Sequence, residues 1–266
     1  MQDRAFVRGI NVAWERAGAG PAFIWGHGLN NSRAAENEFG LVDQEALSVH
    51  MDVVRYDARG HGDTDLTTGV GDYNWDQLAL DQFALADSLG VGSYIAAGAS
   101  LGAATALHAA VLEPERIEAL VLVVPPTGWE TRAAQARRYE TMASIIDTMG
   151  VEPLVTGLDS VPVADPLLEV ADHSERQVRN LRSADPVRLA ALLRGATTAN
   201  LPDREAVAAV AVPALILAWS GDAGHPESSA HELGRLIEVS SVHIASTLDE
   251  MRTWTDRIVE FVAGLG

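Results

Sequence analysis

The sequence predicts an α/β protein with a mostly parallel, doubly wound sheet and one inserted helical lid. Short apolar runs alternate with helical stretches along most of the 266-residue chain. Runs of this kind are typical of strands buried on both faces of a parallel sheet. About ninety residues then separate the run that ends at Val124 from the next run, which starts at Ala214. A gap of this length without a buried strand indicates an insertion.

The predicted strands are short and end in Gly-, Asp-, Asn- or Pro-rich turn chemistry. The first two flank Gly9 and predict an antiparallel edge hairpin. The hairpin strands are expected at 6–8 and 11–16, and the further strands at 22–25, 53–56, 94–97, 119–124, 214–218 and 242–245.

Helical patterns fill the segments between these runs. Strand–helix alternation of this kind is typical of doubly wound folds. The core helices are expected at 75–89, 103–112, 228–237 and 252–262.

The inserted segment is predicted at residues 127–200, within a core made of residues 1–126 and 201–266. Its helical patterns lie at 131–149, 171–181 and 186–193, with prolines between them. An independent small helical domain is the alternative. The chain returns to the same sheet after the insertion, so we expect a lid over the carboxyl edge of the sheet.

Composition excludes several classes of function. The formal charge is −18, from 37 acidic and 19 basic residues, so the surface repels phosphate backbones and nucleic-acid binding is not expected. All the basic residues are arginine, which excludes Schiff-base chemistry, a pyridoxal cofactor and a Walker-type phosphate loop. The absence of cysteine excludes disulfides, thiolate metal sites and a cysteine nucleophile.

No secretory leader or membrane anchor is predicted. The first residues lack a basic start followed by an apolar stretch, and the longest apolar runs fall far short of the roughly 20 residues of a membrane span. We therefore expect a cytoplasmic protein with no membrane partner. The sequence leaves monomer and homodimer both open.

The strongest chemical signal is the Gly-Ala-Ser-Leu-Gly sequence at residues 98–102, centred on Ser100. A predicted strand precedes it and a helix of small residues follows it. This context is typical of a nucleophile elbow, in which a serine sits on a tight strand-to-helix turn. A merely glycine-rich turn is the alternative. We interpret Ser100 as the nucleophile.

With this elbow, the chain resembles the α/β-hydrolase fold family over nearly its whole length. The sequence at 23–32, with His27 and Gly28 at its centre, is similar to the family's strand-then-His-Gly loop. The resemblance implies an oxyanion hole made by the backbone N–H groups of Leu29 and Leu101. Two such donors on one carbonyl oxygen stabilise the transition state of acyl transfer. His27 is expected to brace the loop.

Two further segments carry the resemblance. Residues 55–63 resemble the family's Asp-x-Arg-Gly-His-Gly turn, which implies a structural turn and not a metal site, since no fourth ligand is evident. Asp222, four residues before Pro226, matches the family's catalytic acid, and Ser…Asp is the family's chain order. A helix cap is the alternative for Asp222.

The family's base, a histidine in the loop after the last strand, is missing. Asp249 and Glu250 occupy that loop, and His243 comes before it, in mid-strand. At about 3.3 Å per residue, His243 would lie roughly 20 Å from the expected position of the base. By elimination His225, three residues after Asp222, is the candidate base, oriented by Asp222 or by one of the two loop acids. A structural turn residue is the alternative, because the short spacing works against alignment of the two side chains.

The substrate pocket is expected between the elbow, Leu29 and the lid. Trp25, Trp129 and Trp219 are candidates to line it, with burial in the core as the alternative. Three lid arginines are candidates to receive an anionic substrate, with an ordinary solvated helix face as the alternative; they are Arg132, Arg137 and Arg138.

The resemblance implies a serine hydrolase that cleaves a carboxylic ester or lactone through an acyl-Ser100 intermediate, similar to the small esterases and the enol-lactonase group. The substrate would be a small molecule, and no cofactor or metal is implied. Two alternatives stay open: a degenerate binding protein that has lost its base, or another cofactor-free enzyme of the fold, such as a perhydrolase or C–C hydrolase.

Overall fold

An eight-stranded sheet runs through residues 1–265, which the computed structural model describes with all side chains except those of residues 38 and 39. The strand order is β1-β2-β4-β3-β5-β6-β7-β8. β1 and β2 form an antiparallel hairpin, β2 is antiparallel to β4, and all further pairings are parallel. The predicted α/β class with a mostly parallel sheet is confirmed. The strands are β1 (Gln2–Val7), β2 (Ile10–Ala17), β3 (Ala22–Gly26), β4 (Asp52–Tyr56), β5 (Tyr94–Ala99), β6 (Ile117–Val123), β7 (Ala214–Trp219) and β8 (Ser240–Ala245).

The first hairpin is longer than the sequence predicts. Its first strand starts at Gln2, and Arg8 lies in the turn and not in a strand. Arg8 and Gly9 have φ values of 46° and 83°. Two consecutive positive φ values give the turn a twist that matches the twist of the flanking strands.

Two apolar layers cover the two faces of the sheet. In β3 the side chains alternate, with Phe23 and Trp25 in one layer and Ile24 in the other. A strand places successive side chains on opposite faces, so a continuous apolar run fills both layers. Helices α3, α4, α10 and α11 supply one layer, and α2, α12 and α13 supply the other.

Each predicted helix has a counterpart in the structure, and further short helices lie between them. The predicted helix at 252–262 corresponds to Trp254–Ala263, and a separate short helix, Leu248–Arg252, precedes it. No helix within residues 1–265 is long and apolar enough to cross a lipid bilayer. The helices are α1 (Arg33–Phe39), α2 (Gln44–Ser48), α3 (Trp75–Ser88), α4 (Leu101–Leu112), α5 (Trp129–Met149), α6 (Glu152–Gly157), α7 (Asp165–Leu168), α8 (His173–Ser183), α9 (Pro186–Thr198), α10 (Arg204–Ala208), α11 (Glu227–Leu236), α12 (Leu248–Arg252) and α13 (Trp254–Ala263), with short 3-10 turns η1 (Val70–Tyr73), η2 (Pro114–Arg116) and η3 (Leu158–Ser160).

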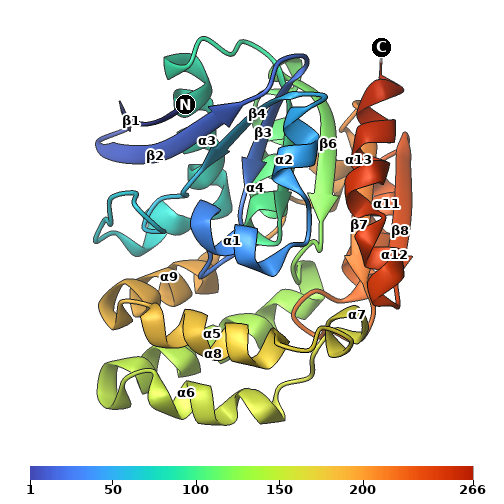
Figure 1. The fold of residues 1–266 in the computed structure, drawn as a ribbon. Coiled ribbons are helices and arrows are strands. Elements are labelled where there is room, and N and C mark those ends of the chain that lie inside the picture. The colour runs from blue at the N-terminus through green and yellow to red at the C-terminus, as the bar shows by residue number, and fades with distance from the viewer. Residues whose placement is uncertain (266) are drawn as a thin grey trace.

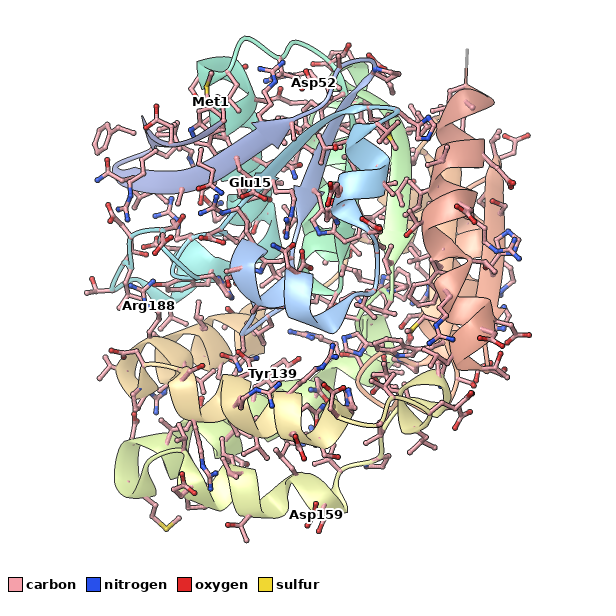
Figure 2. The ribbon with its side chains drawn as sticks, in the orientation of Figure 1. Met1, Glu15, Asp52, Tyr139, Asp159 and Arg188 are labelled. Carbon is pink, nitrogen blue, oxygen red and sulfur yellow. The ribbon has the colours of Figure 1, made fainter. Side chains whose placement is uncertain are left out.

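Helices α5 to α9 lie between β6 and β7 in the chain and form a separate layer beyond one end of the sheet (Figure 1). α5 and α9 pack on each other through an apolar cluster that includes Ile146 and Leu193. Arg188 of α9 donates to the carbonyl oxygens of Gly60 (3.0 Å) and Thr64 (2.9 Å) and so ties this layer to the core (Figure 2). The layer therefore lies over the loops that follow the parallel strands.

Candidate active site

Ser100 occupies the turn between β5 and α4 in a backbone conformation that non-glycine residues rarely adopt, with φ 53° and ψ −107°. Neighbouring glycines make this turn possible. A Cβ on Gly102 would lie 2.0 Å from the carbonyl oxygen of Gly26, and one on Gly98 would lie 2.5 Å from the same oxygen. The close approach of β3, β5 and α4 thus requires glycine, and it places Ser100 at the carboxyl end of β5.

His225 contacts Ser100 from the loop between β7 and α11. Its Nε2 lies 2.8 Å from Ser100 Oγ, and its Nδ1 lies 2.7 Å from Asp222 Oδ2. A carboxylate only accepts hydrogen bonds, so Nδ1 carries the proton and Nε2 is free to accept from the serine hydroxyl. The structure therefore brings together the three residues predicted as nucleophile, base and acid. The short Asp222–His225 spacing does not prevent their alignment.

Asp222 is fixed by donors from its own loop. The backbone N–H of Gly224 donates to Oδ1 at 2.7 Å, and Trp219 Nε1 donates to Oδ2 at 3.2 Å. Burial raises the pKa of Asp222, but these hydrogen bonds, with the hydrogen bond and charge of His225, outweigh it and hold the pKa at about 2. Asp222 is ionised at neutral pH and can orient the imidazole.

The two predicted oxyanion donors lie on segments that the structure joins. The Gly102 N–H donates to the His27 carbonyl oxygen at 3.0 Å, which holds the loop of Leu29 against the start of α4. Leu101 is the first residue of α4, so its N–H has no partner within the helix. In residues 1–265 neither the Leu29 nor the Leu101 N–H has a hydrogen-bond partner. Both N–H groups are therefore available to a ligand.

Residues 13–255 match the sequence model of the Alpha/beta hydrolase family. The chain belongs to this family. The hydrolase is 30% identical to 3-oxoadipate enol-lactonase 2 of Acinetobacter baylyi over 102 residues, which are 38% of this chain and 36% of that enzyme. Its structure is similar to that of a thermophilic esterase from Thermogutta terrifontis, with a TM-score of 0.81, 21% identity, and 100% and 99% of the two chains covered. It is also similar to the enol-lactonase from Burkholderia xenovorans LB400, with a TM-score of 0.76, 22% identity and 99% of each chain covered.

His27 and the turn at residues 55–63 have structural partners in the hydrolase. His27 Nε2 accepts from the Ala58 N–H at 3.0 Å, and its Nδ1 lies 2.8 Å from the Gly28 carbonyl oxygen. Asp57 accepts hydrogen bonds from the N–H groups of Arg33 (2.8 Å) and Asp63 (3.0 Å). Across the described part of the chain, no cluster of His, Asp and Glu side chains is arranged to hold a metal ion.

The loop after β8 has mostly local hydrogen bonds, and the Leu248 N–H also donates to Glu169 of the inserted segment at 3.0 Å. Glu250 accepts from the N–H groups of Ser246 (2.7 Å) and Thr247 (3.2 Å), and Asp249 pairs with Arg252 at 2.9 Å. His243 stays within β8, beside Arg257. Of the candidate acids left open by the sequence, Asp222 is the one that the structure pairs with His225.

A cavity of about 310 Å³ adjoins the site. Leu29, Asp222 and His225 are among its lining residues, whereas Ser100 is not. The cavity is therefore next to the serine on the side where His225 and Leu29 lie. Helices and loops of the inserted segment form its opposite wall, where Val163 and Leu167 lie. This is the expected place for the pocket.

Two of the three candidate tryptophans line the cavity, namely Trp25 and Trp219. Trp129 does not line it and packs instead against the core, which is the alternative that the sequence left open. Its Nε1 donates to the Pro202 carbonyl oxygen at 3.0 Å, and the Arg204 guanidinium lies 4.6 Å from the centroid of its ring. Trp129 instead fastens the start of α5 to the core.

The three lid arginines that were candidates to receive an anion also do not line the cavity. Arg132 is 4% exposed, donates to the carbonyl oxygens of Ala196 and Ala199, and stacks at 4.4 Å over the ring of Trp75. Arg137 and Arg138 are exposed. Arg132 therefore has a structural role within the helical layer.

Sequence reasoning missed three polar residues of α8 that line the cavity, namely His173, Gln177 and Asn180. The three positions have the i, i+4, i+7 spacing of one helical face. That spacing is visible in the sequence, but a polar helical face is ordinarily interpreted as facing solvent.

Proposed function

We propose that this hydrolase cleaves a carboxylic ester or lactone through an acyl-Ser100 intermediate. The observation that carries the proposal is the continuous hydrogen-bonded chain from Ser100 Oγ through His225 to Asp222, with distances of 2.8 and 2.7 Å. A serine hydroxyl is a weak nucleophile until an adjacent base accepts its proton. His225 is within hydrogen-bond distance and has its other nitrogen bonded to a carboxylate, as such a base requires.

The reaction proceeds in two halves. Ser100 Oγ attacks the carbonyl carbon while its proton passes to His225 Nε2, and the N–H groups of Leu29 and Leu101 bind the oxygen that becomes negative. The C–O bond to the leaving group breaks, and His225 returns the proton to the departing oxygen. Water then attacks the acyl carbon and gives its proton to His225. The C–O bond to Ser100 breaks, His225 returns the proton to Ser100 Oγ, and the acid is released.

Residues 127–200 would act as the lid of this site. This role is supported by the cavity wall that the inserted segment forms opposite His225. Asn180 Nδ2 also donates to the Asn30 carbonyl oxygen at 3.1 Å, which links α8 to the loop that follows Leu29. The alternative of a degenerate binding protein rests on the missing histidine after β8, and the position of His225 beside Ser100 supports the enzyme instead.

Replacement of the nucleophile tests the proposal. Ser100→Ala should lower kcat/KM for a p-nitrophenyl ester by a factor on the order of 10⁵, because it removes the attacking oxygen and leaves the rest of the site in place. It should also abolish labelling by an organophosphonate probe. Ser246→Ala, on an exposed loop, is the matched control and should retain both. Undiminished turnover by Ser100→Ala would refute the acyl-serine mechanism.

A further inference from the structure

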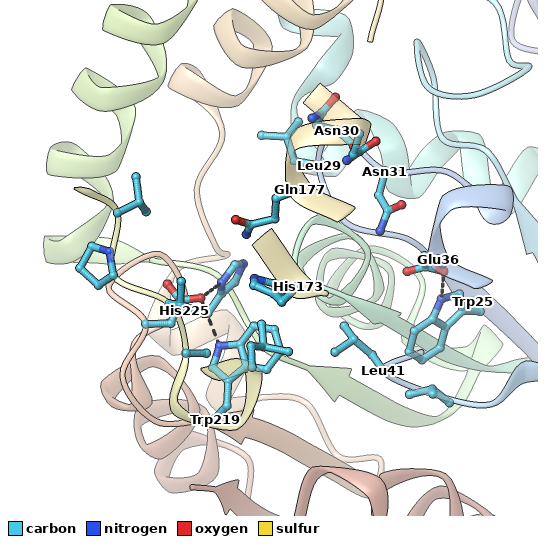
Figure 3. A pocket seen from close by; sticks show the side chains of 18 of the residues that line it. Trp25, Leu29, Asn30, Asn31, Glu36, Leu41, His173, Gln177, Trp219 and His225 are labelled. Carbon is cyan, nitrogen blue, oxygen red and sulfur yellow. Dashed lines mark hydrogen bonds and ion pairs between the residues drawn. The ribbon is translucent and has the colours of Figure 1, made fainter. Parts of the chain in front are cut away.

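Helix α8 presents a polar face to the cavity. His173, Gln177 and Asn180 line it, whereas Glu175 and Arg179, on other faces of the helix, are exposed. Figure 3 shows His173 and Gln177 beside the same cavity as His225. A helix that packs on a protein interior normally turns apolar residues inward. An inward face of imidazole and amide groups is therefore a feature of the cavity that packing alone does not explain.

These groups have unused hydrogen-bonding capacity. His173 is 6% exposed, and its buried Nε2 has no hydrogen-bond partner. The buried Oε1 of Gln44, which also lines the cavity, has none either. Within the described residues the Gln177 amide is likewise without a hydrogen-bond partner, while Asn180 is held by Asn30. Buried polar atoms are normally paired, so the two buried atoms, His173 Nε2 and Gln44 Oε1, point to a polar ligand, and the partly exposed Gln177 amide is free to bind the same ligand.

The cavity offers no cation to such a ligand. No arginine is among its described lining residues, and the chain contains no lysine. Burial lowers the pKa of His173, and the charge of Arg176 lowers it further, so its imidazole is neutral at pH 7.

The acidic groups of the lining act against an anion. Asp222 is ionised, and Glu36 is the second carboxyl. Burial raises the pKa of Glu36 to about 7, although Trp25 Nε1 donates to it at 2.7 Å. The Arg55 guanidinium lies 3.8 Å from Glu36 but is already paired with Glu15 at 2.8 Å. A carboxylate entering this cavity would lose its water without gaining a counter-ion.

We propose that the α8 face formed by His173 and Gln177 is a substrate subsite that binds an uncharged oxygen, such as a ketone, ether or hydroxyl, so that the hydrolase prefers neutral oxygenated esters or lactones and rejects carboxylate-bearing ones. This inference rests on the proposed ester or lactone hydrolysis at Ser100. It adds a chemical class of substrate to that reaction.

Three p-nitrophenyl esters with five-carbon acyl groups test the subsite: the pentanoate, the 4-oxopentanoate and the mono-ester of glutarate. Each kcat/KM is divided by the rate of hydroxide-catalysed hydrolysis of the same ester. Relative to the pentanoate, the ketone ester should react about 5- to 10-fold faster, the effect of one net hydrogen bond. The glutarate mono-ester should react at least about 100-fold more slowly, because its carboxylate is buried without a partner.

Two variants locate the effect. Gln177→Leu and His173→Phe should each bring the ketone-to-pentanoate ratio to within about twofold of one. The reason is that the whole ketone preference is no larger than the effect of a single hydrogen bond. Gln177 is partly exposed, so its variant keeps the test sound if His173→Phe does not fold. Glu175→Gln, on the exposed side of α8, is the control and should keep the ratios of the unmodified protein.

The outcomes separate the subsite from the reaction. Ser100-dependent cleavage of all three esters at similar relative rates would overturn the subsite and leave the proposed function standing. An unchanged ketone preference in both variants would overturn it as well. If the purified protein cleaves none of the esters, or Ser100→Ala cleaves them undiminished, the proposed function fails and the subsite fails with it.

Discussion

The loops after β7 and β8 lie side by side but differ in chemistry. The two strands are parallel neighbours, with Trp219 opposite Ala245, so both loops leave the sheet at the same edge. The loop after β7 carries Asp222 and His225, which are hydrogen-bonded to each other. The loop after β8, where the family resemblance places the base, carries a capping box that starts α12. One loop thus holds two groups that are hydrogen-bonded in a chain to Ser100, and its neighbour's acids, Asp249 and Glu250, bond elsewhere.

We infer that the position of the proposed base depends on distance in space and not on chain order. Adjacent parallel strands bring their carboxyl ends to one place, so a histidine on either loop has access to the elbow. The β7 loop makes a tight turn, with φ 82° at Gly221 and a hydrogen bond from the Gly224 N–H to Asp222. That turn aligns an acid and a base only three residues apart.

The largest effect is expected from removing His225, the proposed base on the β7 loop. His225→Ala should lower kcat/KM for a p-nitrophenyl ester by a factor on the order of 10⁵, close to that of Ser100→Ala, because members of one catalytic unit fail together. His243→Ala is the matched control, since His243 lies in β8 beside Arg257. If His225→Ala retained most of the activity, the base would have to come from elsewhere, and the contrast between the loops would be lost.

A smaller effect is expected from the acid on the same loop. Asp222→Asn should lower kcat/KM by a factor on the order of 10⁴, because the amide stabilises the wrong tautomer of His225 and not the imidazolium. Steady-state kinetics on the same ester measures this loss. Asp249→Asn, on the β8 loop, is the control and should stay near the unmodified rate. An equal loss in both variants would show that the β8 loop takes part after all.

Asp222 should also make stability depend on pH. Its pKa is about 2 in the folded chain, against about 3.9 for an ordinary aspartate in an unfolded one. The ionised carboxylate therefore stabilises the fold above about pH 4, and this contribution is lost as the pH falls toward 2. Denaturant titrations should show a steeper loss of stability over this range for the unmodified protein than for Asp222→Asn. Parallel losses would mean that Asp222 is not held as a carboxylate.

What the sequence reveals of this site depends on how local each feature is. Ser100 with its glycines and Asp222 with its proline are contiguous motifs, so one chain is enough to find them. His225 was identified only by elimination, because its alignment with Asp222 depends on the turn between them. The polar face of α8 and the burial of Arg132 were not predicted. Both depend on how the inserted helices dock on the core, and local periodicity does not encode docking.

The smallest effect is expected from the β8 loop itself, and it concerns stability. Thr247 Oγ1 accepts from the Glu250 N–H at 3.3 Å, and the Glu250 carboxylate accepts from the Thr247 N–H at 3.2 Å. A capping residue of this type contributes about 1 kcal/mol to the free energy of unfolding. Thr247→Ala should therefore lower that free energy by about 1 kcal/mol in a denaturant titration and keep kcat/KM within about twofold. Thr247→Ser, which keeps the accepting oxygen, should restore most of the stability. The one hydrogen bond from this loop to the inserted segment, from the Leu248 N–H to Glu169 at 3.0 Å, uses a backbone donor that Thr247→Ala leaves in place. A large loss of kcat/KM in Thr247→Ala without a loss of stability would therefore contradict this assignment and give the loop a role in the reaction.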